Sequence, residues 1–222
     1  MKSSFLFIAV GSLLLAARPA VAAPREAVAL PPPAADPFSQ VIAARSVAEF
    51  ARRQRDPQAM IVAARMLQEV PFEDKASDKA PSESAPPAFS PAGLFAEAKT
   101  LAKNDASLLM QINIAQSTSS RGVVSSAFGK GLLRLVQDVA ARTTYRFALR
   151  ATGGQLLRVG AIGDVGTAML LRIVDAAGRV VCTDNPGNYA PVCSTTPAVA
   201  GSYQVEVINR SGVKSRAVIL SN

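Results

Sequence analysis

The chain has 222 residues, no histidine and an excess of positive charge, with 24 lysine or arginine residues against 16 acidic ones. The absence of histidine excludes the Ser-His and Cys-His catalytic arrangements and the usual zinc sites. The formal net charge of +8 favours anionic partners, although a basic surface with no dedicated partner is also compatible with it.

The first 22 residues have the pattern of a cleavable secretory signal peptide. Lys2 supplies a positive charge, residues 5–17 form an apolar run, and Ala20-Val21-Ala22 offers the small residues that signal peptidase reads. A membrane-spanning helix needs about 20 apolar residues, so the run is too short for an anchor. We therefore expect cleavage near Ala22, a periplasmic or secreted protein, and no transmembrane segment in the mature chain.

A leader and a helical region follow the signal peptide. Residues 23–38 are rich in alanine and proline, which predicts a flexible leader. Residues 39–120 carry apolar stripes at helical spacing. They predict two helical hairpins separated by a Pro-rich loop at 71–91.

Three helix starts in this region are marked by capping residues. Asp56-Pro57 and Ser90-Pro91 each place a capping side chain before a proline at the first helical position, and Asn104-Asp105 precedes the fourth helix. Two hairpins cannot bury a continuous core alone, so the following domain or a partner is expected to cover one face. The residues expected to be buried on the fourth helix are Leu108, Leu109, Ile112 and Ala115.

Residues 121–222 predict a β-sandwich, so that the expected fold class is α+β with helices and strands segregated. Tyr145, Phe147 and Leu149 alternate with Arg146, Ala148 and Arg150, which is the period of a strand. Short strands evenly separated by turn residues favour a sandwich or barrel. The strands expected on this basis cover residues 144–151, 156–162, 169–174, 179–182, 203–208 and 214–220.

The two cysteines of the chain, Cys182 and Cys193, lie close together in the predicted sandwich. An even, closely spaced pair in an exported protein predicts a disulfide, which would stabilise the fold by roughly 3 kcal/mol. A pair of buried free thiols is the alternative.

From about residue 143 to the end, the chain resembles the bacterial pre-peptidase C-terminal domain. The matching features are the turns at Gly153-Gly154 and 163–166, the strand at 169–174, and Pro197 followed by Gly201-Ser202-Tyr203. The resemblance implies a β-sandwich of jelly-roll type. It also implies a non-catalytic appendage of the kind found on secreted proteins, notably peptidases, some of whose relatives bind collagen or other extracellular polymers.

One departure from that family weakens any expectation of a calcium site. Family members often carry Asp-Leu-Asp where this chain has Ala168-Met169-Leu170. Calcium needs several hard oxygen ligands, and Asp164, Asp184 and Asn185 could still supply some of them. We expect no metal and no cofactor.

The candidate binding residues are arginines of the predicted sandwich. Residues from 121 on carry 12 positive side chains against 5 acidic ones, a net of +7. Arg146, Arg150 and Arg172 lie opposite the apolar side of their strands, and they form a cationic patch with Arg158 or Arg179 if those strands are neighbours. A solvated outer sheet face is the alternative reading.

The chemistry of this patch narrows the class of partner. It lacks the interleaved aromatic residues of single-strand nucleic-acid platforms, so no nucleic-acid partner is expected. Acidic envelope polymers and proteins fit it, and peripheral contact with anionic lipid is compatible with it.

The sequence offers no recognisable catalytic constellation. A Ser-Lys dyad is the remaining nucleophilic option, and Lys130 near Ser125 and Ser126 is supported only by adjacency along the chain. We therefore expect a non-enzymatic exported binding or structural protein of the cell envelope. The alternative is an accessory domain, chaperone-like or inhibitory, that acts in trans on a secreted hydrolase.

Overall fold

The computed structural model describes residues 36–76, 86–118 and 131–222, all of which belong to one compact unit, Pro33–Asn222. The expected signal peptide and almost all of the expected leader lie outside the described residues. Helices occupy the first part of this unit and two sheets the second, which confirms the α+β class. None of the helices described has the length and hydropathy needed to cross a membrane.

Four helices precede the sandwich, and three of them begin with a proline directly after a capping side chain. The carboxylate of Asp36 accepts a hydrogen bond from the Phe38 amide, Asp56 caps the second helix and Ser90 the third. The first helix therefore begins at Pro37, two residues before the expected boundary, and Asp36 belongs to the fold rather than to a leader. The helices are α1 Pro37–Gln54, α2 Pro57–Gln68, α3 Pro91–Ala102 and α4 Ala106–Thr118.

The strands form two sheets, here named sheet A and sheet B. Sheet A has the order β1-β2-β9-β4-β7, and sheet B has the order β3-β8-β5-β6. The strands are β1 Phe72–Asp74, β2 Leu132–Val139, β3 Thr144–Ala151, β4 Leu157–Ile162, β5 Met169–Val174, β6 Val180–Asp184, β7 Val192–Thr195, β8 Gly201–Asn209 and β9 Ser215–Ser221.

The strand order is that of a jelly roll. When β1 is set aside, eight antiparallel strands remain, and consecutive strands alternate between the two sheets except for β5 and β6, which are paired neighbours in sheet B. Sheet A then reads first, eighth, third and sixth, and sheet B reads second, seventh, fourth and fifth. This is the double Greek key of a jelly-roll sandwich, as expected from the sequence.

Three strands, β1, β2 and β7, lie where the sequence did not predict them. β1 falls within the stretch that was expected to be a loop, and it pairs in parallel with β2, with Phe72 opposite Leu132. β2 itself was not among the expected strands. Its side chains are buried or half-buried on both faces apart from Leu133, so it lacks the alternation by which a strand with one wet face is recognised.

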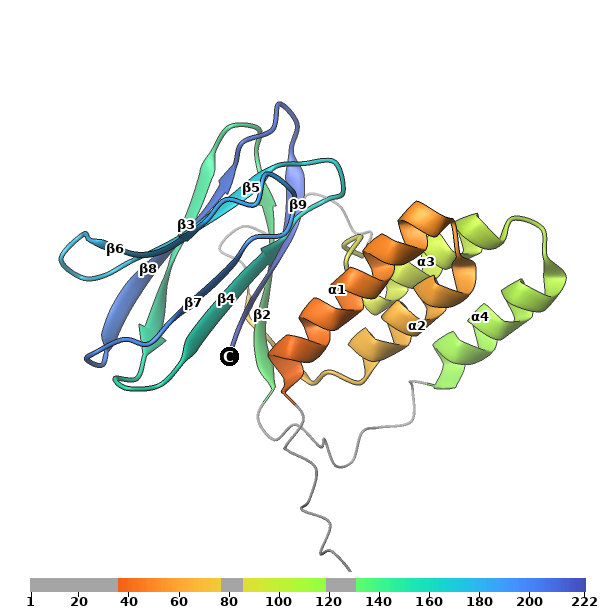
Figure 1. The fold of residues 1–222 in the computed structure, drawn as a ribbon, viewed down its shortest axis with the longest axis horizontal. Coiled ribbons are helices and arrows are strands. Elements are labelled where there is room, and N and C mark those ends of the chain that lie inside the picture. Colours follow the sequence, from red (N-terminus) through yellow and green to blue (C-terminus); the bar gives the residue numbers. More distant parts are fainter. Residues whose placement is uncertain (1–35, 77–85, 119–130) are drawn as a thin grey trace, which may run out of the picture. The chain divides into compact units, whose positions relative to one another are not determined.

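The unit has two hydrophobic cores, one on each side of sheet A. Residues such as Leu171, Val205 and Ile219 fill the space between the two sheets. The other core joins the helices to sheet A, and it includes Phe38 of α1 together with Val218 of β9. Figure 1 shows sheet A lying between sheet B and the helices. The β domain therefore covers the helical face, which was one of the two coverings expected.

Polar contacts accompany this helix–sheet core. The Arg52 guanidinium pairs with Glu97 at 2.7 Å and donates to the Tyr189 hydroxyl at 3.1 Å. Arg45 donates to the Ala190 carbonyl at 3.1 Å. Burial raises the pKa of Tyr189 to about 12, so the hydroxyl stays protonated at neutral pH. These bonds join two arginines of α1 to the β6–β7 connection, through Tyr189 and Ala190.

The predicted disulfide is present and joins the two sheets. Cys182 lies on β6 of sheet B and Cys193 on β7 of sheet A, with 5.9 Å between their Cα atoms. Both strands are edge strands, so the bond closes the side of the sandwich where β6 faces β7.

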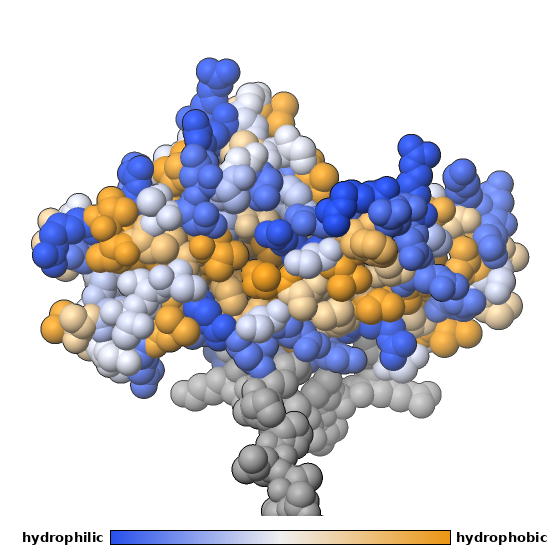
Figure 2. All heavy atoms as spheres, in the orientation of Figure 1, coloured by the Kyte–Doolittle hydropathy of each residue, from blue (hydrophilic) through white to orange (hydrophobic). Residues whose placement is uncertain are grey.

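Helix α4 is more exposed than its sequence pattern predicts. Of the four residues expected to be buried, Ile112 is buried, whereas Leu108, Leu109 and Ala115 are half-buried. Met110 and Ile114 are 65% and 58% exposed. Figure 2 shows hydrophobic residues at the surface over the right-hand part of the view, where α4 lies. The helix has only α2 and α3 as major neighbours among the described elements, which leaves much of its circumference in solvent.

Candidate binding face

The outer face of sheet B brings Arg146 and Arg172 together on either side of Glu206. β8 lies between β3 and β5, and the register places Glu206 opposite both arginines. Arg146 Nε donates to Glu206 Oε1 at 2.8 Å, and one terminal nitrogen of Arg172 donates to Glu206 Oε2 at 3.3 Å. The two arginines that the sequence analysis grouped together therefore lie on strands separated by one strand, β8, and share a carboxylate on it.

Glu206 is sunk beneath the two guanidinium groups. Its side chain is 11% exposed, whereas the side chains of Arg146 and Arg172 are 55% and 39% exposed. The carboxylate cancels one positive charge and fixes the direction of both guanidiniums. Each arginine still has N–H donors beyond those that Glu206 accepts, so the pair can bind a further acceptor without first being ordered.

Arg150 completes the surface that we call the arginine face, which consists of Arg146, Arg150, Arg172 and Glu206. Arg150 is two residues beyond Ala148 on β3, on the same side of the strand as Arg146, and is opposite Ser202. It is exposed. Three arginines and one glutamate leave a net charge of +2 (3 − 1) on the outer side of sheet B.

A shallow hollow of about 480 Å³ lies on this side of the sheet, lined in part by Arg146, Ala148, Gln204 and Asp175. A second hollow of about 350 Å³ adjoins it and shares Asp175. Backbone hydrogen bonding from Arg179 lowers the pKa of Asp175, and the Arg179 side chain adds to the effect. Asp175 therefore stays ionised and tied to the β5–β6 turn, and Arg179 is paired there rather than joining the arginine face.

Arg158 does not belong to the arginine face. It lies on β4 of sheet A, where its guanidinium pairs with the Asp36 carboxylate at 2.7 Å and covers the Phe38 ring at 4.9 Å. Hydrogen bonding from Arg158 holds the pKa of Asp36 well below its usual range, against the opposing effect of burial. Arg158 thus anchors the start of α1 on sheet A, and the expectation that it contributes to the patch is not met by this geometry.

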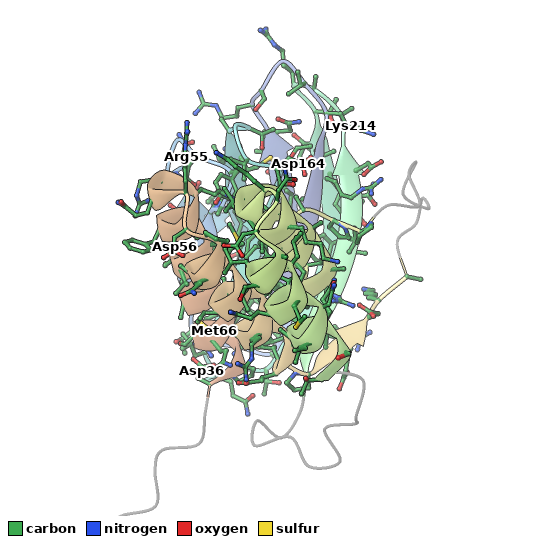
Figure 3. All side chains as sticks on the ribbon, turned by 90° about the vertical axis from the view of Figure 1, so that its right-hand side faces the viewer. Asp36, Arg55, Asp56, Met66, Asp164 and Lys214 are labelled. Atoms are coloured by element: carbon green, nitrogen blue, oxygen red, sulfur yellow. A yellow bond between two sulfur atoms is a disulfide. The ribbon has the colours of Figure 1, made fainter. Side chains whose placement is uncertain are left out.

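The carboxylates considered for calcium have backbone partners. Asp164 accepts the amide of Arg216 at 2.8 Å, and Asp184 accepts the amide of Val192 at 2.7 Å. Figure 3 shows Asp164 at the opposite end of the unit from Asp36. No cluster of three or more histidine, cysteine or acidic residues suited to a metal ion occurs in the described ranges. Lys130, Ser125 and Ser126, considered as a dyad, lie outside the described residues.

Glu206 and Asp36 are the residues whose roles sequence reasoning missed. Glu206 is the acidic residue of an alternating strand, on the side opposite Val205 and Val207, which placed it on an outer face but gave no partner. Asp36 precedes a proline in the same manner as Asp56, and that signal was sufficient to find the start of α1.

Comparison with known proteins adds little to this picture. No protein-family model and no curated protein matches the chain. Among solved structures, it is similar to the Clostridium thermocellum N-terminal endo-1,4-beta-D-xylanase 10B, in a structure of its CBM22-1-GH10 modules complexed with xylohexaose, with 14% identity and a TM-score of 0.23. The match covers 32% of this chain and 17% of that chain, and it does not bear on the function proposed below.

Proposed function

We propose that this chain is a non-enzymatic binding or structural protein of the cell envelope, exported after cleavage near Ala22, whose arginine face meets an anionic polymer or protein. The observation that carries the proposal is the arrangement of Arg146 and Arg172 around the recessed carboxylate of Glu206. The resemblance of the sandwich to pre-peptidase C-terminal domains supports the same class of function, because those domains are non-catalytic appendages of secreted proteins.

The ordering of the two guanidiniums favours binding over a purely solvated role. Immobilising a long side chain on association costs about 0.5–1.5 kcal/mol. Glu206 imposes much of that order before any ligand arrives, since it holds Arg146 through Nε. A planar guanidinium held in this way presents its terminal nitrogens as a fork that matches carboxylate, sulfate or phosphate oxygens.

The position of the face also supports the proposal. The helices pack on sheet A, so the outer side of sheet B is the broad sandwich face that they leave uncovered (Figure 1). The exposed residues between the arginines carry no charge, and two of them have short side chains: they are Ala148, Ser202 and Gln204. A polymer chain can therefore lie across the strands without meeting a bulky side chain.

Retention on an immobilised acidic polysaccharide such as polygalacturonate tests the proposal. The protein lacking residues 1–22 should elute at a given salt concentration, and Arg150→Glu should elute earlier because it reverses one charge of the face. One cation near an anionic surface contributes about 1 kcal/mol, so the reversal should weaken binding about tenfold or more. Arg150 is a suitable position because its replacement leaves the Glu206 ion pairs in place.

The matched control is Arg65→Glu, which makes the same change of charge at an exposed position on α2. Equal effects of the two substitutions would show that net charge alone governs retention and would contradict the proposal. Salt-resistant co-purification with one secreted hydrolase, in place of polymer retention, would instead favour an accessory role in trans.

Glu206→Gln provides a test of opposite sign. It adds one positive charge to the arginine face, so retention on polygalacturonate should increase even as the free energy of unfolding falls by about 1 kcal/mol through loss of the ion pairs. Chemical denaturation and salt elution measure the two effects on one sample. Unchanged retention would contradict the proposal, whereas retention that falls together with stability would mean that the order imposed by Glu206 matters more to binding than the added charge.

A further inference from the structure

β3 is an edge strand whose outward backbone groups follow from its register. β8 is its only neighbour within the described residues. The Asn209 amide donates to the Thr143 carbonyl at 2.9 Å, so Thr143 and every second residue after it bond to β8. The N–H and C=O groups of the intervening residues Arg146, Ala148 and Arg150 consequently point away from β8.

A small apolar cleft of about 20 Å³ lies beside this edge, between β3 and β2. Leu149 and Phe147 of β3 line it from one sheet, and Leu133 and Leu135 of β2 line it from the other. Leu133 is 36% exposed although it lies on the inward side of its strand. The sandwich is therefore incompletely closed along this side, in contrast to the side that the disulfide closes.

Aromatic rings extend the apolar surface along β3. Tyr145 and Phe147 stack with 5.8 Å between their centroids and are only half-buried. Lys75 adds a positive charge to the lining of the cleft, whereas Arg134, which also lines it, is paired with Asp74 at 2.6 Å. Main-chain groups with no hydrogen-bond partner among the described residues, an apolar cleft on the inner side and arginines on the outer side thus occur together along one strand.

We propose that the edge of β3 docks an extended peptide segment of a partner protein by strand addition, and that this segment alternates acidic and apolar residues. This deepens the proposed function, on which it rests, because it makes the anionic partner a protein and supplies the mode of recognition. In strand addition the main chain provides affinity and alternate side chains provide specificity. The apolar residues of the segment lie over the cleft and the half-buried rings of Tyr145 and Phe147, and its acidic residues lie beside Arg146 and Arg150.

The same charges disfavour a second copy of this chain as the occupant. In an antiparallel pair of β3 strands centred on Ala148, Arg146 of one copy lies opposite Arg150 of the other. Like charges directly opposite one another destabilise a strand pair, and charged side chains on an edge are a common protection against self-association. If the added strand is acidic, its carboxylates lie opposite Arg146 and Arg150, and the charge interaction at these positions becomes attractive.

Synthetic octapeptides test the proposal directly. The probe is acetylated and amidated (Glu-Val)4, and the controls are (Lys-Val)4 and a block peptide of four glutamates followed by four valines. The alternating acidic peptide should bind the protein lacking residues 1–22 at least about tenfold more tightly than either control, as measured by isothermal titration calorimetry. Equal binding of the block peptide would overturn the proposal, because it would show attraction to charge without strand register.

Ala148→Pro removes one outward amide while leaving the ladder to β8 intact, since Ala148 does not bond to β8. It should weaken binding of (Glu-Val)4 about tenfold, whereas the control Ala148→Ser, which keeps the amide, should bind as the unaltered protein does. Unchanged affinity in a folded Ala148→Pro variant would overturn the proposal.

Hydrogen exchange of the unaltered protein tests the same proposal without any substitution, so it can be used even if the proline variant fails to fold. The amides of Arg146, Ala148 and Arg150 should exchange at least about tenfold more slowly with saturating (Glu-Val)4. Absence of protection at these amides would overturn strand addition, as would binding to phosphatidylglycerol vesicles but to no peptide. Failure of the proposed function is recognised separately, as polygalacturonate retention that Arg150→Glu does not alter.

Discussion

At the scale of single residues, Asp36 joins local and long-range structure. Its carboxylate caps α1 through the Phe38 amide and also pairs with Arg158, which is 122 residues further along the chain. The same guanidinium covers the Phe38 ring, a favourable cation–π geometry. One acidic residue therefore specifies both where α1 begins and where that end lies on sheet A (Figure 3).

The charge of Asp36 should make stability depend on pH in acid. The Arg158 hydrogen bond lowers the pKa of Asp36 in the folded protein, whereas the unfolded value is about 3.9. The stabilisation is therefore complete above roughly pH 4 and is lost as the pH falls towards the folded pKa. Asp36→Asn keeps a capping oxygen but loses the charge, so its deficit in unfolding free energy should be largest near neutral pH and should shrink below about pH 4.

Urea denaturation at a series of pH values measures that deficit. The control is the same substitution in an Arg158→Gln background, where the partner charge is already gone and the deficit should be small and independent of pH. A deficit that does not change with pH in the presence of Arg158 would show that the cap alone accounts for the role of Asp36.

At the scale of elements, the disulfide should stabilise the sandwich by closing one side of it. It joins positions 11 residues apart on edge strands of different sheets. The chain-entropy estimate for a loop of about this size is roughly 3 kcal/mol. Replacing both cysteines with alanine should lower the free energy of unfolding by about that amount, and a reducing agent should produce a similar loss in the unaltered protein. A change well below about 1 kcal/mol would contradict the estimate.

Gly160 of β4 provides a second prediction at this scale, because α1 lies directly against it. A Cβ atom at this position would be 3.4 Å from Cζ of Phe38. Alanine is therefore close to ordinary contact, whereas the branched side chain of valine would force the ring away. Gly160→Val should cost about 2 kcal/mol by overpacking and Gly160→Ala less than about 1 kcal/mol, both measured by thermal denaturation. Equal effects would mean that α1 yields at this contact.

Elements were predictable from the sequence where the signal is local. The caps at Asp56 and Ser90 located two helices, and the alternation around Phe147 located β3. β1 was missed because three residues have no period, and its partner is 60 residues away along the chain. β2 was missed because its covering from both sides removes the contrast between its faces.

The candidate site was predictable only in part for a similar reason. Alternation placed Arg146, Arg150 and Arg172 on outer faces, but the meeting of Arg146 with Arg172 depends on β8 lying between their strands. No local pattern specifies that order. Arg158 shows the converse, because alternation cannot reveal that its strand belongs to the other sheet or that α1 covers it.

At the scale of the whole unit, the helices and sheet A depend on each other for burial. The helix–sheet core includes Val218 and Leu220 of β9, Leu132 of β2 and Ile162 of β4, each no more than 3% exposed. Without the helices these side chains would form a contiguous apolar surface, which soluble proteins rarely display. The jelly roll thus has all the strands of its topology, but the apolar outer side of sheet A is buried only when the helices cover it.

A fragment that begins at residue 131 should therefore not remain monomeric. It retains the core between the sheets, but it exposes the side of sheet A that α1 covers. We expect oligomers on size-exclusion chromatography and strong binding of a hydrophobic dye. Replacing Val218 and Leu220 by threonine should restore a monomer, because both side chains point to the helix layer, whereas Ala217 and Ile219 point between the sheets. A monomeric, dye-silent fragment without these substitutions would contradict the dependence, and it would make the helices a separable domain.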